Sequence, residues 1–518
     1  MFVGRKRELD KLNTLYAGDS FEFAVVYGRR RGGKTTLIRE FLKDKESVYY
    51  MAVEGTKKEN LRGLSAAFLM QGKNNAPAAE SYVEFRDYEA ALAYIDLLAG
   101  EHRRIVIAID EYPYLAASYP TISSLVQKHI DECWKDSRLF LILCGSSMSF
   151  MEEQVLGYKS PLYGRRTAQF KIRPFTFWEA GEMLKDYSAQ DRALLYGVTG
   201  GIPEYLSRID GTKDVHENII RLFFDESGRL FEEPINLMKQ ELREPMTYHS
   251  IISAIASGAS RLNEIATKTG LESGGCSNQL SSLIALQIVK KEVPMTQNAN
   301  SRSTLYSLED SMYLFWYRFV RPNSSSIMCG VGRQIYETVV MPQNDDFMGR
   351  IFETICRQYL FLPEIYGKLP FPIGQIGRWW GNNAQARRQE EIDLMAISGE
   401  TVLFGECKWR NEKIGRQVVE RLLERGELFQ YPEKYYYIFS KTGFKEETTH
   451  KIGASGLRIR HRPAALRQHL PDPVPERMLC CNFVMSISCN TGPFIFMAQV
   501  VINLRKQVFF AFVVNIVF

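Results

Sequence analysis

The sequence has few of the features that mark secreted, membrane-bound or metal-stabilised proteins. Its nine cysteines are scattered among 518 residues, except for the adjacent Cys480 and Cys481, and their spacing matches neither a zinc site nor a disulfide framework. The first residues become charged at Arg5 and contain no apolar stretch of the kind that precedes a signal cleavage site. We therefore expect a cytoplasmic protein with free thiols and without structural zinc.

An excess of charge of one sign is missing from most of the chain. The formal net charge is +5, but residues 458–518 contain seven basic and two acidic side chains and account for all of it. The rest of the chain contains 58 side chains of each sign. Bulk charge therefore does not indicate nucleic acid binding, and any basic surface has to be local.

No apolar run is long enough for a clear membrane-spanning helix. Residues 494–504 and 507–518 are apolar, but Arg505 and Lys506 separate them, and each half is shorter than the roughly 20 residues that span a bilayer. A single membrane helix is the less favoured alternative. Because several prolines interrupt the residues before these runs, we expect residues 458–518 to be an atypical, disordered segment.

The first part of the chain has the pattern of an α/β domain. A length of 518 residues predicts two to four domains. Residues 1–210 alternate short apolar runs with helix-patterned segments, which is typical of a parallel sheet covered on both faces. The clearest predicted strands are residues 23–27, 105–109 and 139–144.

The character of the sequence changes three times after residue 210. Residues 211–245 are charged and predict a helical connector. Residues 246–325 predict short helices followed by a β-like stretch, and residues 345–445 predict a second α/β unit that opens with an amphipathic helix.

A glycine-rich loop follows the first predicted strand. Residues 28–35 read G-R-R-R-G-G-K-T, which matches the P-loop pattern G-x-x-x-x-G-K-[ST] between a strand and a helix. The backbone N–H groups of such a loop surround phosphate oxygens, and the helix N-terminus adds partial positive charge. Lys34 is expected to reach the β- and γ-phosphates of ATP, and Thr35 to bind Mg²⁺. The predicted ATP-binding residues of the loop are Gly28, Arg29, Arg30, Arg31, Gly32, Gly33, Lys34, Thr35 and Thr36.

A second acidic motif ends the predicted strand at residues 105–109. Asp110 and Glu111 follow it directly. We expect Asp110 to hold Mg²⁺ and Glu111 to polarise the attacking water as a general base. A strand that ends in Asp-Glu is also common in ordinary turns, so this motif gains its weight from the P-loop that precedes it.

Further motifs extend the pattern beyond these two. They are F-V-G-R at residues 2–5, E-L at 8–9, G-S-S at 145–147, P-L-Y-G-R-R at 161–166 and G-G-I-P-E-Y-L at 200–206. With them, the chain resembles the archaeal-type ATPase family, a branch of the AAA+/STAND P-loop ATPases, over most of residues 1–445. The resemblance implies a polar γ-phosphate sensor at Ser146 and, at Pro203, a proline that packs beside the nucleotide.

Arg165 and Arg166 have two interpretations. One is an arginine finger that reaches the γ-phosphate of a neighbouring subunit, which would accelerate hydrolysis and require self-association. The other is a surface pair on a loop, solvated or ion-paired. The sequence does not distinguish them, because geometry between subunits is invisible to it.

Residues 246–325 resemble a winged-helix module. Residues 264–271 follow the E-I-A-x-x-x-G-L pattern of a helix-turn-helix, and residues 289–293 and 303–308 are candidates for its hairpin. DNA binding is one interpretation, and a lid or protein-docking unit is the other. The candidate recognition helix at residues 275–286 contains no Lys or Arg, which weakens the case for phosphate contacts.

The C-terminal unit resembles a domain of unknown function that often follows these ATPases and is similar to the PD-(D/E)xK nuclease, or restriction-endonuclease-like, α/β fold. The matching residues are Glu353, Asp393, Glu406 and Lys408. A hairpin would bring Asp393 and Glu406 together to hold Mg²⁺ or Mn²⁺, with Lys408 stabilising a pentavalent phosphate. The alternative is an ordinary Glu–Lys pair on a half-exposed strand.

A basic-aromatic cluster accompanies this unit and has two interpretations. Its members are Arg378, Trp379, Trp380, Arg387 and Arg388. It is a candidate nucleic acid contact or a fold-stabilising loop.

Together these patterns predict an ATP-dependent molecular switch that uses Mg²⁺. We expect no membrane among its partners. Its first alternative is an ATP-gated DNA nuclease or DNA-remodelling protein of defence or mobile-element type. Its second alternative is an interaction module that binds ATP without appreciable turnover, against which Asp110 and Glu111 argue.

Overall fold

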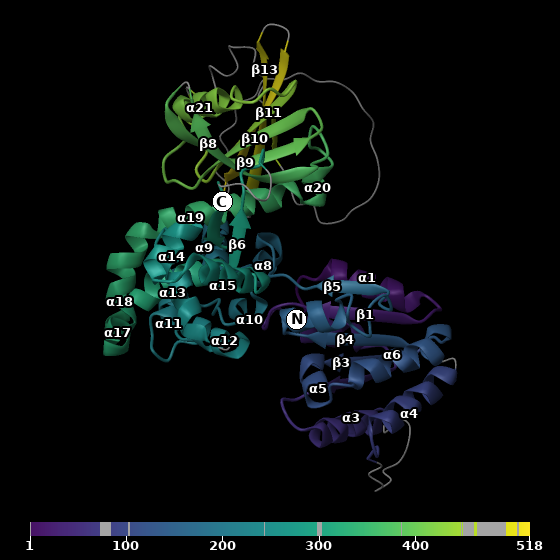
Figure 1. The fold of residues 1–518 in the computed structure, drawn as a ribbon. Helices are drawn as coiled ribbons and strands as arrows, with labels where there is room; N and C mark the ends of the chain where they lie inside the picture. Colours follow the sequence, from purple (N-terminus) through teal and green to yellow (C-terminus); the bar gives the residue numbers. More distant parts are fainter. Residues whose placement is uncertain are drawn as a thin grey trace.

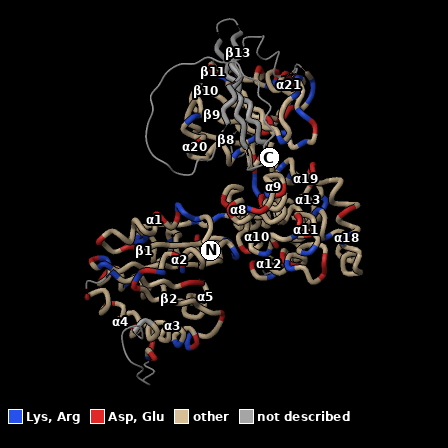
Figure 2. The backbone as a smooth tube through the Cα atoms, turned by 180° about the vertical axis from the view of Figure 1, so that it is seen from behind, with Lys and Arg blue, Asp and Glu red and all other residues tan. Residues whose placement is uncertain are grey.

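The protein is represented by a computed structural model that describes residues 2–72, 84–101, 104–242, 244–297, 303–384, 386–446, 448, 460–463, 494–504 and 507–517. Three units follow one another along the chain: an α/β domain, a helical middle part and a C-terminal sheet (Figure 1). Lys and Arg positions are interleaved with Asp and Glu positions along the backbone (Figure 2), in agreement with the balanced charge of the sequence.

The N-terminal domain is built on a parallel sheet of five strands in the order β2-β3-β4-β1-β5. Its strands are β1 (Glu22–Tyr27), β2 (Ser47–Met51), β3 (Val106–Asp110), β4 (Phe140–Gly145) and β5 (Ala168–Lys171). The three strands predicted from apolar runs are confirmed as β1, β3 and β4, with ends that shift by one residue at most. Because β4 lies between β1 and β3, the residues that follow these three strands share one edge of the sheet.

Helices cover both faces of this sheet. They are α1 (Lys6–Ala17), α2 (Lys34–Leu42), α3 (Lys57–Gly72), α4 (Tyr88–Gly100), α5 (Tyr112–Ser118), α6 (Ile122–Glu132), η1 (Trp134–Asp136), α7 (Met148–Phe150) and η2 (Met151–Val155). Alternate residues of β1 face opposite sides: Val26 packs with α1 and α2, whereas Val25 packs with α3 to α6. The strands are therefore buried on both faces, as the continuous apolar runs predict.

The middle part is helical. It contains α8 (Phe177–Met183), α9 (Ala189–Thr199), α10 (Pro203–Leu206), α11 (Val215–Phe223), α12 (Glu233–Glu241), α13 (Pro245–Ala256), α14 (Leu262–Thr269), α15 (Ser273–Ala285), β6 (Val289–Glu292) and β7 (Leu305–Leu308). β6 and β7 pair antiparallel, so the helices and hairpin expected over residues 246–325 are present. From Phe175 onward the buried side chains pack with this part, and α9 contacts α11 and α16. The change of packing partner thus comes before the predicted boundary at residue 210.

A run of short helical segments leads into the C-terminal unit. They are α16 (Ser311–Phe315), η3 (Trp316–Val320), η4 (Arg321–Asn323), α17 (Ser324–Ser326), η5 (Ile327–Val331), α18 (Gly332–Ile335), η6 (Tyr336–Val340) and η7 (Met341–Gln343). Their aromatic side chains belong to the same core as the middle helices, which explains why this stretch stays helical despite its interruptions.

The C-terminal unit is a mixed sheet with a helix on each face. Its elements are α19 (Asn344–Leu360), α20 (Pro363–Tyr366), β8 (Gln375–Asn383), β9 (Arg388–Ser398), β10 (Thr401–Lys408), α21 (Arg416–Gly426) and β11 (Glu433–Ser440). β8, β9 and β10 are antiparallel neighbours, and β10 and β11 are parallel. Leu403 of β10 faces the core shared with α19, and its neighbour Phe404 faces the one shared with α21.

Three further strands extend this sheet beyond β11. They are β12 (Arg460–Pro463), β13 (Phe494–Leu504) and β14 (Gln507–Val517). β13 and β14 pair antiparallel along their whole length, and β14 pairs in parallel with the edge strand β11. The expected disorder of residues 458–518 as a segment stays a prediction. The other residues of 458–518 lie outside the described part of the chain, and so do Cys480 and Cys481.

Membrane-spanning helices and the state of the cysteines can be assessed in the described residues. No helix among them combines the length and the apolar character needed to cross a bilayer. The six cysteines among them have free thiols, and four, including Cys144, are buried.

Candidate nucleotide-binding site

The P-loop connects the carboxyl end of β1 to the first turn of α2. Its backbone takes conformations that favour glycine, with φ of 155° at Gly28 and 86° at Gly33. A Cβ atom on Gly28 would lie 2.3 Å from the carbonyl oxygen of Ile172, which directly follows β5, so the chain at the end of β5 leaves no room for a side chain there. The glycines thus allow the tight turn that aims backbone N–H groups at a phosphate.

Lys34 lies inside this turn. Its side chain is 5% exposed, and its ammonium donates hydrogen bonds of 2.9 Å to the carbonyl oxygens of Gly28 and Arg29. Burial lowers the pKa of Lys34, and nearby Glu111 and Asp110 oppose that effect. The arrangement holds the ammonium at the centre of the loop, where the β- and γ-phosphates of a nucleotide are expected.

Thr35 and Asp110 form an oxygen-rich pair at the carboxyl edge of the sheet. The Thr35 hydroxyl donates to Asp110 Oδ2 at 2.7 Å, the Tyr49 hydroxyl donates to the same oxygen at 2.8 Å, and the Glu111 N–H donates to Oδ1 at 2.9 Å. Asp110 is fully buried. Hard oxygen donors of this kind fit Mg²⁺, which usually keeps several waters and binds one or two carboxylates beside phosphates. A Mg²⁺ here would neutralise phosphate charge.

Glu111 directly precedes α5 and has a left-handed backbone conformation, with φ of 50°. Its Oε2 accepts hydrogen bonds from the Ser146 hydroxyl at 2.7 Å and from the Ser146 N–H at 3.2 Å. Ser146 directly follows β4, so the sheet order brings it to Glu111. A non-glycine residue in this conformation is strained and often marks a functional site.

Three other predicted residues lie at or near the loop. Thr36 is exposed in the first turn of α2, and Gly32 accepts a 2.9 Å hydrogen bond from the guanidinium of Arg5. Pro203, at the start of α10, lies 3.7 Å from the position of a Cβ on Gly33. Arg5 itself is a buried contact to the loop that the predicted residue set omits, although it belongs to the F-V-G-R motif.

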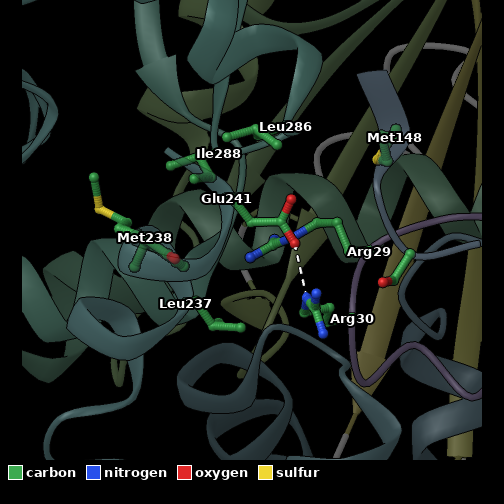
Figure 3. Close-up of a pocket in the computed structure, with 10 residues that line it drawn as sticks. Arg29, Arg30, Met148, Leu237, Met238, Glu241, Leu286 and Ile288 are labelled. Atoms are coloured by element: carbon green, nitrogen blue, oxygen red, sulfur yellow. Dashed lines mark hydrogen bonds and ion pairs between the residues drawn. The ribbon is translucent and has the colours of Figure 1, made fainter. Parts of the chain in front are cut away.

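The three consecutive arginines of the loop each form an ion pair with the middle part. Arg29 pairs with Asp310, Arg30 pairs with Glu241 at 3.1 Å, and Arg31 pairs with Glu233. Figure 3 shows Arg30 and Glu241 pointing toward each other beside Arg29. These acidic partners were not predicted, because they lie about 200 to 280 positions away in the sequence and belong to no local motif.

Burial and the partner charge shift the pKa values of Arg29 and Glu241 in opposing directions. Burial lowers the pKa of the Arg29 guanidinium, but the neighbouring Asp310 outweighs this and raises it overall. Asp310 also caps α16, because its Oδ1 accepts the N–H groups of Met312 at 2.8 Å and Tyr313 at 3.3 Å. Burial raises the pKa of Glu241, and Arg30 opposes that effect.

Arg165 and Arg166 are not brought to the P-loop within one chain. They precede β5 and therefore lie at the amino edge of the parallel sheet, whereas the P-loop lies at its carboxyl edge. Arg165 instead donates two hydrogen bonds, of 2.8 and 2.6 Å, to the carboxylate of Asp131 in the last turn of α6. A finger role for these residues requires a second copy of the chain and stays a prediction.

The C-terminal residues predicted as a nuclease-like site converge. Lys408 Nζ lies 2.6 Å from Glu406 Oε1 and 3.6 Å from Asp393 Oδ2, and Asp393 also accepts the Cys407 N–H at 2.8 Å. Arg425 of α21, which sequence reasoning missed, pairs with Glu406 at 2.9 Å. Although burial lowers the pKa of Lys408, the two carboxylates raise it overall.

Glu353 of α19 faces the same cluster through Arg378. The two side chains form an ion pair at 3.4 Å, and Arg378 also pairs with Glu292 and Glu391. Burial raises the pKa of Glu353 to about 7, and Asp393 adds to the shift while Arg378 opposes it. Within the described residues, no three His, Cys, Asp or Glu side chains lie close enough together to hold a metal ion.

The neighbouring aromatic residues are engaged inside the protein. Trp379 is buried with its ring 4.9 Å from Phe429, and the Trp380 indole donates to the Ser303 carbonyl at 3.1 Å. Together with the three ion pairs of Arg378, these contacts fit the fold-stabilising interpretation of the cluster better than an exposed base-stacking surface.

A cleft of about 1390 Å³ runs between the three units of the chain. Its walls include Arg29 of the P-loop, Glu353 of α19 and Asp393 of β9, so one P-loop arginine and two residues of the C-terminal cluster line the same space. Arg350 and Arg357, which are exposed, flank Glu353 on α19.

The P-loop, the Asp-Glu pair after β3 and the serine after β4 define the class of this protein as a P-loop ATPase with a parallel sheet. Residues 2–209 match the family described as an ATPase domain predominantly from Archaea, and residues 316–419 match archaeal and bacterial proteins of unknown function. An uncharacterized protein of Methanocaldococcus jannaschii is 34% identical over 449 residues, which are 85% of this chain and 96% of that protein. The chain therefore belongs to the archaeal-type P-loop ATPase family.

Other similar proteins match a shorter part of the chain or have a lower sequence identity. An uncharacterized ATP-binding protein of M. jannaschii is 46% identical over 46 residues, which are 9% of this chain and 78% of that protein. A Walker-type ATPase of Pyrococcus abyssi has a TM-score of 0.47 and 18% identity, with coverage of 61% of this chain and 96% of that one. The ORC2 protein of Aeropyrum pernix has a TM-score of 0.39 and 15% identity, with coverage of 63% and 94%.

Proposed function

We propose that the protein is an ATP-hydrolysing molecular switch that uses Mg²⁺. The observation that carries the proposal is the set of three ion pairs between Arg29, Arg30 and Arg31 of the P-loop and carboxylates of the middle part. A loop that binds phosphates and also holds a neighbouring unit through its own side chains links the nucleotide state to the position of that unit.

The geometry of the site supports a role for each residue in this proposal. Lys34 would bind the β- and γ-phosphates, and Thr35 and Asp110 would hold Mg²⁺. Glu111, oriented by Ser146, polarises the water that attacks the γ-phosphate. Pro203 packs beside the loop at Gly33 and so connects the nucleotide to α10.

Both side chains of the Arg29–Asp310 pair are largely withdrawn from solvent. The side chains are 13% and 3% exposed, and loss of one partner of a buried pair costs roughly 3–5 kcal/mol because the other charge stays unpaired. Since Asp310 also caps α16, a shift of Arg29 toward phosphate oxygens changes the support of that helix. Leu286 and Ile288, which follow α15, line the same pocket as Arg29 and Arg30 and support a lid role for the winged-helix-like residues 246–325.

Two variants test this switch. Lys34→Ala is expected to reduce ATP turnover at least ~100-fold, as loss of one transition-state donor does. Asp310→Asn keeps a capping side chain but removes its charge, so it is expected to bind ATP and to lose the nucleotide-dependent change in hydrogen exchange of α16. Turnover that is equal in wild type and Lys34→Ala would contradict hydrolysis at this site. An α16 whose exchange is the same with ATP and ADP in wild type would contradict the switch and leave an ATP-binding interaction module.

A second candidate function is nucleic acid cleavage at the C-terminal cluster. It is favoured by the convergence of Asp393, Glu406 and Lys408 beside a cleft that also contains Arg29. The ammonium of Lys408 lies between the two carboxylates, where a nuclease of this kind would hold Mg²⁺. The two exposed arginines of α19 provide charge for a phosphate backbone, whereas α15 contains no Lys or Arg.

Cleavage is tested on single- and double-stranded DNA with Mn²⁺, in the presence and absence of ATP. We expect wild type to degrade DNA and Asp393→Asn to be inactive while it keeps full ATP turnover. Lys34→Ala, tested in parallel, measures whether ATP gates the activity. Equal degradation by wild type and Asp393→Asn indicates a contaminating nuclease and rejects this function.

A further inference from the structure

Arg30 differs from the arginines on either side of it in the way it is held. Its guanidinium donates to the Tyr114 hydroxyl at 2.8 Å and to Glu241 Oε1 at 3.1 Å. One partner is therefore neutral, and the side chain remains 28% exposed. Arg29, by contrast, pairs with the buried Asp310, and Arg31 pairs with a Glu233 side chain that is fully buried.

The two partners of Arg30 come from opposite sides of the site. Tyr114 is in α5, which begins directly after Glu111, and Glu241 is the last residue of α12 in the middle part. Arg30 therefore bridges the helix behind the predicted general base and the unit that the nucleotide is proposed to move. Figure 3 shows the contact between Arg30 and Glu241 among the residues that line a pocket, which include Arg29.

Arg30 also lies close to the reacting groups. Ser146, which holds Glu111, lines the same pocket as Arg30. Burial lowers the pKa of Arg30, and the carboxylate of Glu111 is one of the groups that raise it. Burial also lowers the pKa of Lys34, and the positive charge of Arg30 lowers it further. Arg30, Lys34 and Glu111 are thus close enough for their charges to interact.

We propose that Arg30 acts within its own chain as the arginine that stabilises the transferring γ-phosphoryl group, and that Glu241 controls its availability. The proposal rests on the proposed ATPase function. It makes hydrolysis independent of a second copy of the chain and assigns no role in catalysis to Arg165 or Arg166.

The reaction is balanced without any further reactant. The oxygen of a water molecule bonds to the γ-phosphorus while the bond from that phosphorus to the β–γ bridging oxygen breaks, which yields ADP and inorganic phosphate. The water proton passes to Glu111 and from there to solvent. Arg30 remains protonated and donates N–H groups to the γ-phosphate oxygens, where negative charge is spread in the transition state.

Glu241 makes this contact dependent on the middle part. In the present position of α12, Glu241 accepts a hydrogen bond from the Nε of Arg30. A shift of α12 away from the loop releases the guanidinium toward the γ-phosphate, and a shift toward the loop withdraws it. The same ion pair that links the units thereby regulates the rate of hydrolysis.

The test measures turnover at saturating ATP and Mg²⁺, ATP affinity, and binding of ADP with aluminium fluoride as a mimic of the transition state. For Arg30→Ala we expect turnover to fall about 1000-fold, the lower end of the range for arginine fingers, with ATP affinity within about threefold of wild type. The fluoride complex should be lost. Arg30→Lys should recover part of the turnover because it keeps the charge but not the fork, and Arg333→Ala, at an exposed arginine paired with Glu217, is the matched control for a lost guanidinium.

Two more measurements separate the competing roles. Wild-type turnover per chain should not depend on protein concentration, and Glu241→Gln should raise turnover because Arg30 is held less tightly. The proposal is overturned if Arg30→Ala hydrolyses ATP at the wild-type rate, if ATP affinity and turnover fall together, or if turnover rises with concentration and is lost in Arg165→Ala/Arg166→Ala. If wild type itself matches Lys34→Ala, the proposed ATPase function fails instead.

Discussion

Arg29, Arg30 and Arg31 are identical neighbours in sequence, yet each has a different environment. Arg29 is buried against an acidic helix cap, Arg30 bridges two helices, and Arg31 has φ of 67° and lies over the ring of Tyr205. In a tight loop, successive side chains point in different directions, so each meets a different element. Residue type therefore sets what each arginine can bind, and the surrounding helices decide which partner it has.

The pH dependence of stability has a defined origin at His249. This imidazole is buried in α13, its Nδ1 contacts the Tyr317 hydroxyl, and burial, with Arg321 and Lys239, lowers its pKa from 6.5 to about 4. The unfolded chain thus binds a proton below pH 6.5 that the folded protein excludes. The stability contributed by the neutral imidazole is present above pH 6.5 and is lost as the pH falls toward 4.

We therefore expect the free energy of unfolding to fall between pH 6.5 and 4 by about 1.4 kcal/mol per pH unit from this residue. In His249→Gln, which does not titrate, chemical denaturation should give a lower stability at pH 7 and a shallower slope in this window. Tyr317→Phe is the control, because it removes the hydrogen bond and keeps the titrating group. Equal slopes in wild type and His249→Gln would rule this origin out.

At the scale of elements, the strand-loop-helix unit of β1, the P-loop and α2 is specified by contiguous residues. The apolar run, the glycines and the lysine were sufficient to predict its position, because the loop conformation depends mainly on residues within it. The β9–β10 hairpin was predictable for the same reason, since a short turn fixes its register. The cations around that hairpin were not, because Arg378 and Arg425 come from β8 and α21.

The P-loop conformation predicts the effect of a single methyl group. Gly28→Ala would place a Cβ 2.3 Å from the Ile172 carbonyl oxygen at a φ of 155°, so the loop or β5 has to shift. We expect ATP affinity to fall at least ~10-fold, which corresponds to about 1.4 kcal/mol of binding free energy. Calorimetric titration measures it. Gly100→Ala, where a Cβ meets no atom within 4 Å, should bind like wild type, and tight binding by Gly28→Ala would show that the turn is not required.

At the scale of the whole molecule, the buried side chains form two separate sets of cores. Two clusters enclose the sheet of the N-terminal domain. From Phe175 onward, one large cluster joins the middle helices to α19 and one face of the C-terminal sheet, and a smaller one joins the other face of that sheet to α21. Apolar burial is shared within a set and not between them, so each set should unfold cooperatively. The ion pairs of the P-loop arginines cross between the two sets.

This division predicts two thermal transitions in calorimetry. Addition of ATP and Mg²⁺ should stabilise the transition of the N-terminal domain, by about 2.7 kcal/mol at a ligand concentration 100 times the dissociation constant. The second transition should move less. Lys34→Ala should show both transitions without the nucleotide shift, and a shift confined to the second transition would place the nucleotide elsewhere.

The sequence by itself determined where the candidate nucleotide site lies, because β1, the P-loop and the Asp-Glu pair are local patterns whose chemistry depends on adjacent residues. It also indicated the helices and hairpin of the middle part and the four residues of the C-terminal cluster. Only the tertiary structure decided that the loop arginines pair with Asp310, Glu241 and Glu233, and that Arg165 lies at the far edge of the sheet. Ion pairs between residues hundreds of positions apart depend on how whole elements pack, and no local pattern encodes that packing.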